Sequence, residues 1–242
     1  MKKLLLVLGL LLPMLGMANE GAHLERAPID PNNQASLQRG AQVFVNYCLS
    51  CHSAASMRYN RMTDIGLSNA QIKANLLFAG EKVGDTMTVA MQKKEAKAWF
   101  GAAPPDLSVE ARARGADWLY GYLRSFYRDD TTSTGWNNAV FDKVAMPHVL
   151  WQLQGQQILK VEDKVNAHGV KTEVHTLVLD QPGSMSPAEY DATIADLVNY
   201  LVFMGEPAKS QRLQLGLIVL LFLGLLFVIA YYLKKEFWKD IH

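Results

Sequence analysis

Hydrophobic residues form two long uninterrupted runs in this chain, one near each end. The run over residues 215–233 contains no charge, and a helix of that length crosses the hydrocarbon core of a bilayer. Aromatic residues and lysines lie at its end, as is typical of a membrane surface: Tyr231, Tyr232, Lys234, Lys235, Trp238 and Lys239. We predict a transmembrane anchor over residues 209–234 and, from the positive charges, a cytoplasmic tail over residues 235–242.

The run over residues 4–12 follows two lysines and precedes the small-residue stretch Gly16-Met17-Ala18. This order is that of a secretory signal peptide. We predict a signal peptide over residues 1–18, with cleavage after Ala18 favoured and cleavage after Ala22 left open. Residues 19–208 then form a periplasmic domain that a single membrane pass holds to the bacterial inner membrane.

Between the two runs, apolar residues recur at helical spacing. A first helix leading to Cys48 carries Gly40 and Phe44 one turn apart, a spacing that lets another helix cross closely. The expected partner helix begins at the capping box Ser186-Pro187-Ala188-Glu189 and ends at Gly205. Its apolar stripe consists of Tyr190, Ile194, Leu197, Val198 and Leu201.

Shorter elements are predicted between these two helices. One helix is capped by Ser68 and reaches about residue 79, and another is capped by Ser108. A further helical stripe consists of Trp118, Leu119, Tyr122 and Phe126. Residues 158–161 and 172–179 have strand-like patterns and flank a turn at residues 166–169. The fold is therefore predicted to be mainly α, with a small β-hairpin insertion and one C-terminal transmembrane helix.

Charge excludes one class of partner. The chain has 24 basic and 23 acidic side chains, and removal of Lys2 and Lys3 with the signal peptide leaves 22 basic against 23 acidic. A near-neutral mature protein without a basic run lacks the electrostatic footprint of nucleic-acid binding. We therefore expect no nucleic-acid partner.

The chemistry of the chain centres on Cys48-Leu49-Ser50-Cys51-His52, which holds both of its cysteines. Two cysteines at this spacing can each add to one vinyl group of the same porphyrin, and the histidine that follows binds the iron. A redox-active dithiol is the alternative, but that motif follows a buried strand, whereas the residues before Cys48 have helical spacing. A zinc site would require further ligands at similar spacing. The motif therefore predicts one covalently bound haem c.

A second axial ligand sets the redox role, since a thioether raises the potential and a second histidine lowers it. Met146 is the first candidate, because Pro147 restricts the local backbone and a rigid loop can present the sulfur. His148 and His175 are the alternatives. The remaining exported methionines lie close to the attachment motif, in a lysine-rich stretch that we expect to be solvated, or at helix ends: Met57, Met62, Met87, Met91, Met185 and Met204.

Haem propionates require cationic or hydroxyl partners, and arginine has the planar donor fork that suits a carboxylate. Arg112 is the first candidate, with Arg61 and Arg114 as alternatives. His52 should donate its free ring N–H to a backbone carbonyl, so that the other ring nitrogen binds iron. The extended loop at Pro104-Pro105 offers such carbonyls.

Four motifs, in this order, resemble the cytochrome c1 family, the c-type haem subunits of the quinol:cytochrome c reductase complex. They are the attachment motif, Ala103-Pro104-Pro105-Asp106-Leu107-Ser108, Val144-Ala145-Met146-Pro147 and the C-terminal anchor. The resemblance implies a class I-like cytochrome core with insertions. The site residues that it implies are thioether-forming Cys48 and Cys51, axial His52 and Met146, propionate-binding Arg112, and Pro105 beside the haem on the histidine side.

The resemblance also implies one-electron transfer inside a dimeric membrane complex, in which the isolated chain is not an enzyme. The partners would be cytochrome b, a Rieske iron–sulfur protein as donor and a cytochrome c as acceptor. Residues 53–67 match the family only loosely, and the acidic clusters that dock cytochrome c in some relatives are not obvious here. Three other functions stay open: a free-standing tethered cytochrome that donates to a terminal oxidase, a haem-based gas sensor or peroxidase, and a thiol–disulfide oxidoreductase.

Overall fold

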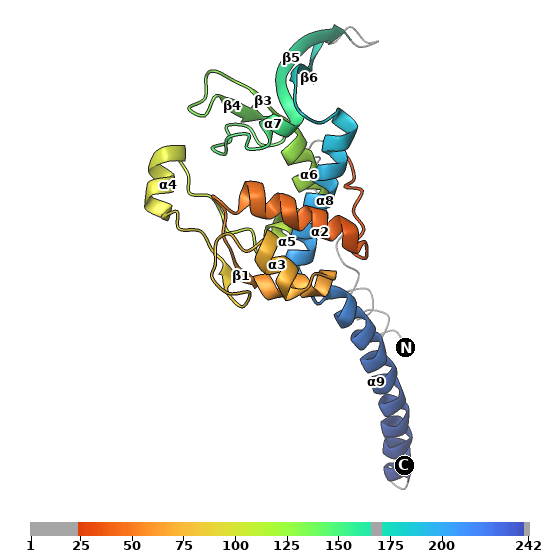
Figure 1. Ribbon diagram of the computed structural model, residues 1–242. Coiled ribbons are helices and arrows are strands. Elements are labelled where there is room, and N and C mark those ends of the chain that lie inside the picture. Colours follow the sequence, from red (N-terminus) through yellow and green to blue (C-terminus); the bar gives the residue numbers. More distant parts are fainter. Residues whose placement is uncertain (1–23, 166–170, 240–242) are drawn as a thin grey trace.

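The computed structural model describes residues 24–165 and 171–239. Within them, a helical domain carries three antiparallel strand pairs, and one long C-terminal helix extends away from it (Figure 1). The mainly helical prediction is therefore confirmed. The predicted signal peptide and the predicted turn at residues 166–169 lie outside the described part of the chain.

Helices and short strands alternate along the domain. The helical elements are α2 (Gln34–Val43), the π-helical η1 (Phe44–Cys48), the 3₁₀-helical η2 (Tyr59–Ile65), α3 (Asn69–Asn75), α4 (Lys93–Phe100), α5 (Glu110–Arg114), α6 (Ala116–Arg124), α7 (Trp151–Gln154), α8 (Pro187–Gly205) and α9 (Lys209–Phe237). The strands are β1 (Ala54–Arg58), β2 (Thr86–Met87), β3 (Phe126–Arg128), β4 (Trp136–Asn138), β5 (Gly155–Val165) and β6 (Lys171–Pro182). β1 pairs with β2, β3 with β4, and β5 with β6.

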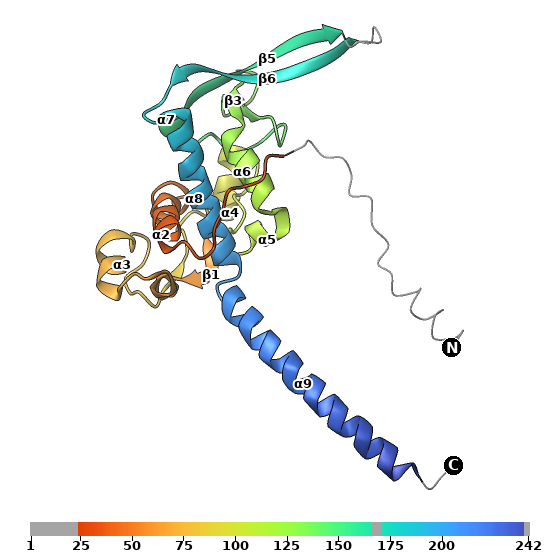
Figure 2. The same cartoon turned by 90° about the vertical axis from the view of Figure 1, so that its right-hand side faces the viewer.

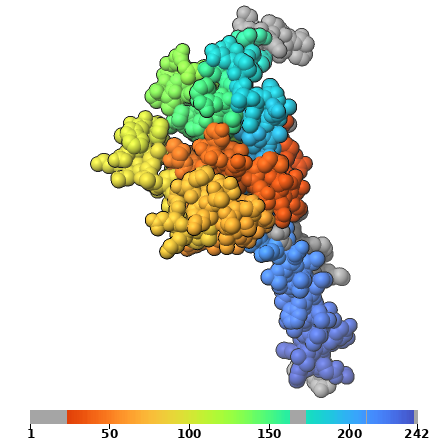
Figure 3. Space-filling model, in the orientation of Figure 1, coloured from red at the N-terminus to blue at the C-terminus, as the bar shows by residue number. Residues whose placement is uncertain are grey.

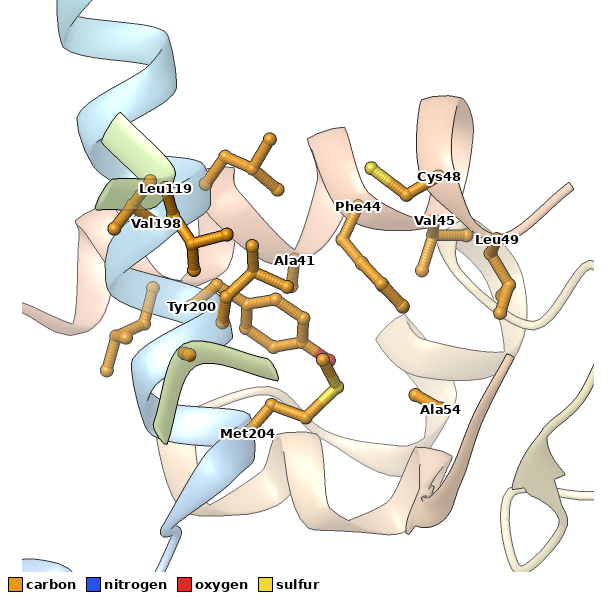
Figure 4. Packing of buried hydrophobic residues seen from close by; sticks show 14 of the residues in the cluster. Ala41, Phe44, Val45, Cys48, Leu49, Ala54, Leu119, Val198, Tyr200 and Met204 are labelled. Carbon is orange, nitrogen blue, oxygen red and sulfur yellow. The ribbon is translucent and has the colours of Figure 1, made fainter. Parts of the chain in front are cut away.

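The core forms where α2 crosses α8. Gly40 lies so close to α8 that a Cβ at this position would overlap the backbone carbonyl oxygen of Asp196. One turn later, the rings of Phe44 and Tyr200 pack with their centroids 5.6 Å apart. Figure 4 shows Tyr200 directed from α8 toward Ala41 and Phe44. The predicted crossing is confirmed, and glycine is required at its centre because no side chain fits there.

α8 begins at the predicted capping box. The Ser186 hydroxyl accepts the backbone N–H of Glu189, and the Glu189 carboxylate accepts the backbone N–H of Ser186 at 2.8 Å. All five positions of the predicted stripe are buried: Tyr190, Ile194, Leu197, Val198 and Leu201. Burial of an aliphatic side chain of this size contributes about 1.5–3 kcal/mol, so this face of α8 is a main source of stability.

Three predicted helix boundaries were wrong. The helix predicted to carry Trp118, Tyr122 and Phe126 ends at Arg124, so Phe126 lies in β3 instead. Ser108 does not cap a helix, because its hydroxyl accepts the backbone N–H of Ser56 at 3.0 Å, and α5 begins at Glu110. Ser68 caps α3 as predicted, but α3 ends at Asn75 instead of near residue 79. At Ser108, a tertiary hydrogen bond from β1 engages the side-chain hydroxyl that a helix cap would otherwise use.

The β5–β6 strand pair projects from the domain on the side away from α9 (Figures 1 and 2). Both strands extend beyond the segments predicted for them, residues 158–161 and 172–179. Its base is fixed to the domain because the Gln157 side chain donates hydrogen bonds to the carbonyls of Arg124 and Phe126, each at 2.9 Å.

α9 contains the predicted membrane segment. Within Gln211–Phe237, the most apolar window of 18 residues has a mean hydropathy of 2.8, and none of that window is buried against the domain. Figure 2 shows the helix extending away from the rest of the chain. Within residues 24–165 and 171–239, it is the one helix that is long and apolar enough to cross a membrane.

Candidate haem site

A single cavity brings the predicted chemistry together. It has a volume of about 300 Å³ and is lined mainly by apolar side chains, together with Cys48, Cys51, His52 and Met146. Phe100, at the end of α4, lines one part, and the loop after β4 lines another. Figure 3 shows the surface hollowed between α4, in yellow, and the green region that carries β3 and β4. Segments far apart in the sequence thus meet at one site.

The attachment motif follows the end of the first helix. α2 widens into the π-helical η1, and the Leu49 N–H bonds to the Phe44 carbonyl at 3.0 Å. The chain then turns back, because the His52 N–H bonds to the Cys48 carbonyl at 2.8 Å. This turn places all three reactive side chains of the motif on the cavity wall. Insertions of this π-helical kind are frequent at functional sites.

The Cys48 thiol is unsuited to dithiol redox chemistry. Burial raises the pKa of this thiol to about 12. A redox-active Cys-x-x-Cys pair depends on a lowered thiol pKa, because the thiolate is the nucleophile. The burial of Cys48 therefore argues against the thiol–disulfide alternative.

His52 makes the predicted backbone contact. Its Nδ1 lies 2.8 Å from the carbonyl oxygen of Pro105, and because a carbonyl can only accept, Nδ1 carries the proton and donates. Burial lowers the pKa of the His52 imidazole, which keeps the ring neutral, as an iron ligand must be. Nε2 is then the nitrogen with a free lone pair.

The loop that carries Pro105 is fixed by its neighbours. The Asp106 carboxylate accepts the backbone N–H groups of Ala55 and Ser108 at 2.8 and 2.9 Å. The Leu107 N–H bonds to the Ser53 carbonyl at 2.8 Å, which ties the loop to the segment directly after His52. The Pro-Pro-Asp-Leu-Ser motif is therefore the structural support of the histidine.

Met146 lies on a loop that two buried asparagines hold. The Asn137 side-chain oxygen accepts the Lys143 N–H at 2.9 Å, and the Asn138 side-chain oxygen accepts the N–H groups of Val140 and Phe141 at 2.9 and 3.1 Å. Lys143 has φ of 57°, a left-handed conformation that such contacts must maintain. Nothing in the local sequence pattern had singled out these asparagines.

Tyr122 and Trp118 were predicted only as part of an apolar stripe, yet both line the cavity. The Tyr122 hydroxyl donates a hydrogen bond to the Met146 sulfur at 3.4 Å, and the Trp118 ring stacks on the Tyr122 ring at 4.8 Å. Their spacing of one helical turn on α6 was the available signal. Reading these positions only as an apolar stripe overlooks the Tyr122 hydroxyl, which is the group that contacts Met146.

The alternative axial ligands lie elsewhere. His148 is buried and stacks on Phe126 with ring centroids 4.8 Å apart, outside the cavity lining. His175 is exposed on β6. Met87 is fully buried in β2, so the expectation that its stretch is solvated was wrong at that residue. In the described part of the chain, Met146 is the one methionine that lines the cavity.

The structure separates the three candidate arginines. Arg114 lines the cavity, and its guanidinium lies 4.7 Å from the centre of the Trp118 ring. Arg112 does not line it, because its methylene groups pack toward Gly205 of α8. Arg61 forms an ion pair with Asp64 at 2.7 Å, also outside the lining. Residues two apart on a helix point in nearly opposite directions, which explains why Arg112, the first candidate, faces away.

The residues present fit a haem c. Two cysteines, an imidazole with a free Nε2 and a thioether line the same apolar cavity, with Arg114 among the lining residues. These are the donor types of a thioether-attached haem with histidine and methionine ligands. The apolar lining suits a porphyrin ring, and a cation suits its carboxylates.

The chain matches known proteins over nearly its whole length. The family model described as the Cytochrome C1 family matches residues 25–169 and 183–241. A protein named ammonia monooxygenase gamma subunit, from Nitrosomonas europaea, is 53% identical over 100% of this chain and 99% of its own length. Cytochrome c1 from Allochromatium vinosum is 48% identical over all of both chains, and cytochrome c1 from Rhodospirillum rubrum is 30% identical over 86% of this chain and 83% of its own.

These matches agree with the motifs and the cavity. The family consists of electron-transfer haem subunits of the bc1 complex, and a single candidate membrane helix fits it. Both the extent of the family match and the full-length identity show the same relationship. The chain therefore belongs to the cytochrome c1 family.

Proposed function

We propose that this chain accepts one electron from a Rieske iron–sulfur protein and passes it to a c-type cytochrome, as a subunit of a dimeric quinol:cytochrome c reductase with cytochrome b. The observation that carries the proposal is the convergence of Cys48, Cys51, His52 and Met146 on one cavity. Family membership supports the electron-transfer role. A haem iron bound here would supply the one-electron couple.

Each residue has a distinct task in the proposal. Cys48 and Cys51 would hold the group covalently, and His52 would bind iron through Nε2 while the Pro105 carbonyl fixes its ring. Met146, whose side chain lines the same cavity, would supply the thioether ligand to the iron. Arg114, in place of Arg112, pairs with a propionate, because it is the arginine of the three candidates that lines the cavity.

The domain arrangement follows the same reasoning. The haem domain, residues 19–208, lies on the periplasmic side of the bacterial inner membrane, α9 crosses the membrane once, and the lysine-rich end stays in the cytoplasm. We interpret the domain as a class I-like cytochrome core in which the β5–β6 hairpin is an insertion. The family model leaves out residues 170–182, which include all of β6, and this supports the interpretation.

A second candidate function comes from one relative. The 53% identity to the protein named ammonia monooxygenase gamma subunit favours a subunit of an ammonia monooxygenase as the alternative. Both functions can use the same haem site for one-electron transfer, so the site does not distinguish between them. The identity of the partner subunits does distinguish between them.

The ligand assignment is tested with Met146→Leu in the full-length, detergent-solubilised protein. We expect the haem to stay attached, because the cysteines are unchanged, and the reduction potential to fall, because a thioether favours ferrous iron. Met91→Leu is the matched control, since Met91 lies outside the cavity lining. An unchanged potential in Met146→Leu would contradict the assignment.

The partners are tested by mild solubilisation, purification through a C-terminal tag and mass spectrometry. Cytochrome b and a Rieske protein in equal amounts with this chain are the expected result. Recovery of monooxygenase subunits would support the second candidate. Recovery of the haem-bearing chain alone or with oxidase subunits would support a free-standing tethered cytochrome.

A further inference from the structure

Tyr122 holds a partly buried position from which it reaches the proposed methionine ligand. Its hydroxyl donates to the Met146 sulfur, with an oxygen–sulfur distance of 3.4 Å. A thioether sulfur is a weak acceptor. Among the described residues, two other hydroxyls contact a methionine sulfur, at 3.6 Å for Thr193 and Met185 and 3.9 Å for Tyr200 and Met87, so the contact to Met146 is the shortest of the three. An apolar residue of similar size would pack equally well on the neighbouring rings.

Two ring contacts and one backbone hydrogen bond hold Tyr122 in place. Trp118 stacks on it with centroids 4.8 Å apart and an interplanar angle of 11°, and Phe126 meets it edge-on at 5.1 Å. The Asn138 side chain donates to the Tyr122 backbone carbonyl at 2.8 Å. The hydroxyl therefore cannot turn far from Met146 without disturbing its neighbours.

Asn138 also holds the loop that carries Met146. Asn138 accepts the backbone N–H groups of Val140 and Phe141 through its side-chain oxygen. Tyr122 and Met146 both pack against the small buried cluster of Phe126, Trp136 and Val144. Asn138 and this cluster thus position both the Tyr122 hydroxyl and the Met146 sulfur, so the fold itself maintains the hydrogen bond between them.

We propose that Tyr122 tunes the haem, by hydrogen bonding to the sulfur of its ligand Met146 and raising the reduction potential. A hydrogen bond to sulfur withdraws electron density from the lone pairs. The sulfur then donates less electron density to iron. Ferric iron depends on that density more than ferrous iron does, so the ferric state loses more stabilisation and the reduction potential rises. Hydrogen bonds to the side chains that bind haem iron are an established means by which proteins set haem potentials. The inference rests on the proposed ligation by Met146.

The test is Tyr122→Phe in the full-length haem-loaded protein, because this change removes the hydroxyl and keeps the ring. We expect the ferric/ferrous equilibrium to shift about fivefold toward ferric in a spectroelectrochemical titration, which is about 40 mV at 59 mV per tenfold for one electron. The near-infrared charge-transfer band of methionine-ligated ferric haem should persist. Tyr190→Phe is the matched control, since its buried hydroxyl donates to the Leu123 carbonyl at 2.9 Å and makes no contact with Met146. Its potential should not change.

A second variant covers the case in which Tyr122→Phe loses the methionine ligand or folds poorly. A ring-fluorinated tyrosine at position 122 keeps the hydroxyl and strengthens it as a donor, so the potential should rise. A potential equal to that of the unmodified protein in either variant, with the band intact, would overturn the inference. If Met146→Leu itself left the potential unchanged, the ligand assignment would fail first, and the two failures are distinct.

Discussion

The two segments that bring the axial-ligand candidates to the cavity are stabilised by different forces. His52 follows directly from α2 and η1, whose apolar face is packed into the main core against α8. Met146 lies on a loop after β4 that contributes little to that core and is held by the side-chain amides of Asn137 and Asn138. The segment that carries His52 is therefore anchored mainly by hydrophobic packing, with the Pro105 carbonyl orienting the ring, whereas the loop that carries Met146 is held mainly by buried hydrogen bonds.

This difference has consequences for how each side responds to change. Hydrophobic packing is distributed over many contacts, so the segment that carries His52 should be displaced only when the crossing of α2 and α8 itself fails. A buried amide network depends on a few directional bonds, and loss of one partner leaves another unsatisfied. The methionine side should therefore be released by single substitutions that leave the rest of the domain folded.

The largest expected effect comes from Gly40→Leu, which breaks the histidine side. A side chain at this position overlaps the Asp196 carbonyl, a backbone atom of α8 that cannot move aside. We expect a loss of about 3 kcal/mol in the free energy of unfolding, together with a lower yield of haem-loaded protein. Denaturant unfolding of the solubilised protein measures it. Gly84→Ala is the control, because a Cβ there meets no atom within 4 Å.

Asn138→Ala tests the methionine side alone. The substitution leaves the Val140 and Phe141 N–H groups and the Tyr122 carbonyl without their partner, at a cost of about 1–3 kcal/mol. We expect Met146 to leave the iron in part of the population, so that the reduced protein binds carbon monoxide. Asn75→Ala on the exposed surface of α3 should bind none. Carbon monoxide binding equal in both variants would contradict a specific role for Asn138.

The two arginines of α5 provide a smaller and sharper contrast. Arg114→Gln removes a cation from the cavity wall, whereas Arg112→Gln removes one that faces α8. Because the Arg114 side chain is 45% exposed, solvent screens its charge, and its proposed ion pair with a haem propionate is worth about 0.2–1 kcal/mol. We expect Arg114→Gln to shift the ferric/ferrous equilibrium toward ferric by up to about fivefold, and Arg112→Gln to leave it unchanged. The opposite pattern would restore Arg112 as the propionate partner.

The smallest effect concerns pH and the α8 cap. Hydrogen bonds from the Ser186 hydroxyl and N–H lower the pKa of the Glu189 carboxyl. A carboxyl with a lowered pKa in the folded state stabilises the protein above its unfolded pKa, about 4.3, and loses that contribution as the pH falls through the folded value. The unfolding midpoints of the natural protein and Glu189→Gln should differ near neutral pH and converge in acid. A gap that persists unchanged at low pH would rule out this linkage.

Much of the helical core could be predicted because its determinants are local. The spacing of Gly40 and Phe44, the capping box at Ser186 and the stripe on α8 each occupy one stretch of chain, and all were confirmed. The contact between His52 and the Pro105 carbonyl was also predictable, since a ligating histidine needs an acceptor for its other nitrogen.

What could not be predicted depends on which side of an element faces which neighbour. Arg112 and Arg114 are equally suitable by residue type, and only the packing of α5 on α8 decides which one faces the cavity. Ser108 looks like a helix cap until β1 supplies a competing donor in the Ser56 N–H. In each case the deciding atom lies far away in the sequence, where local pattern carries no information.

The reactive groups follow from local patterns of residue type, namely the attachment motif, the methionine loop, the histidine support and the anchor. Which of these groups share a cavity depends on the folded chain, which places Arg114 in the lining instead of Arg112 and the Tyr122 hydroxyl against the Met146 sulfur. The two differ because chemical identity belongs to single residues. Orientation results from packing and hydrogen bonds between segments that meet only in the folded chain.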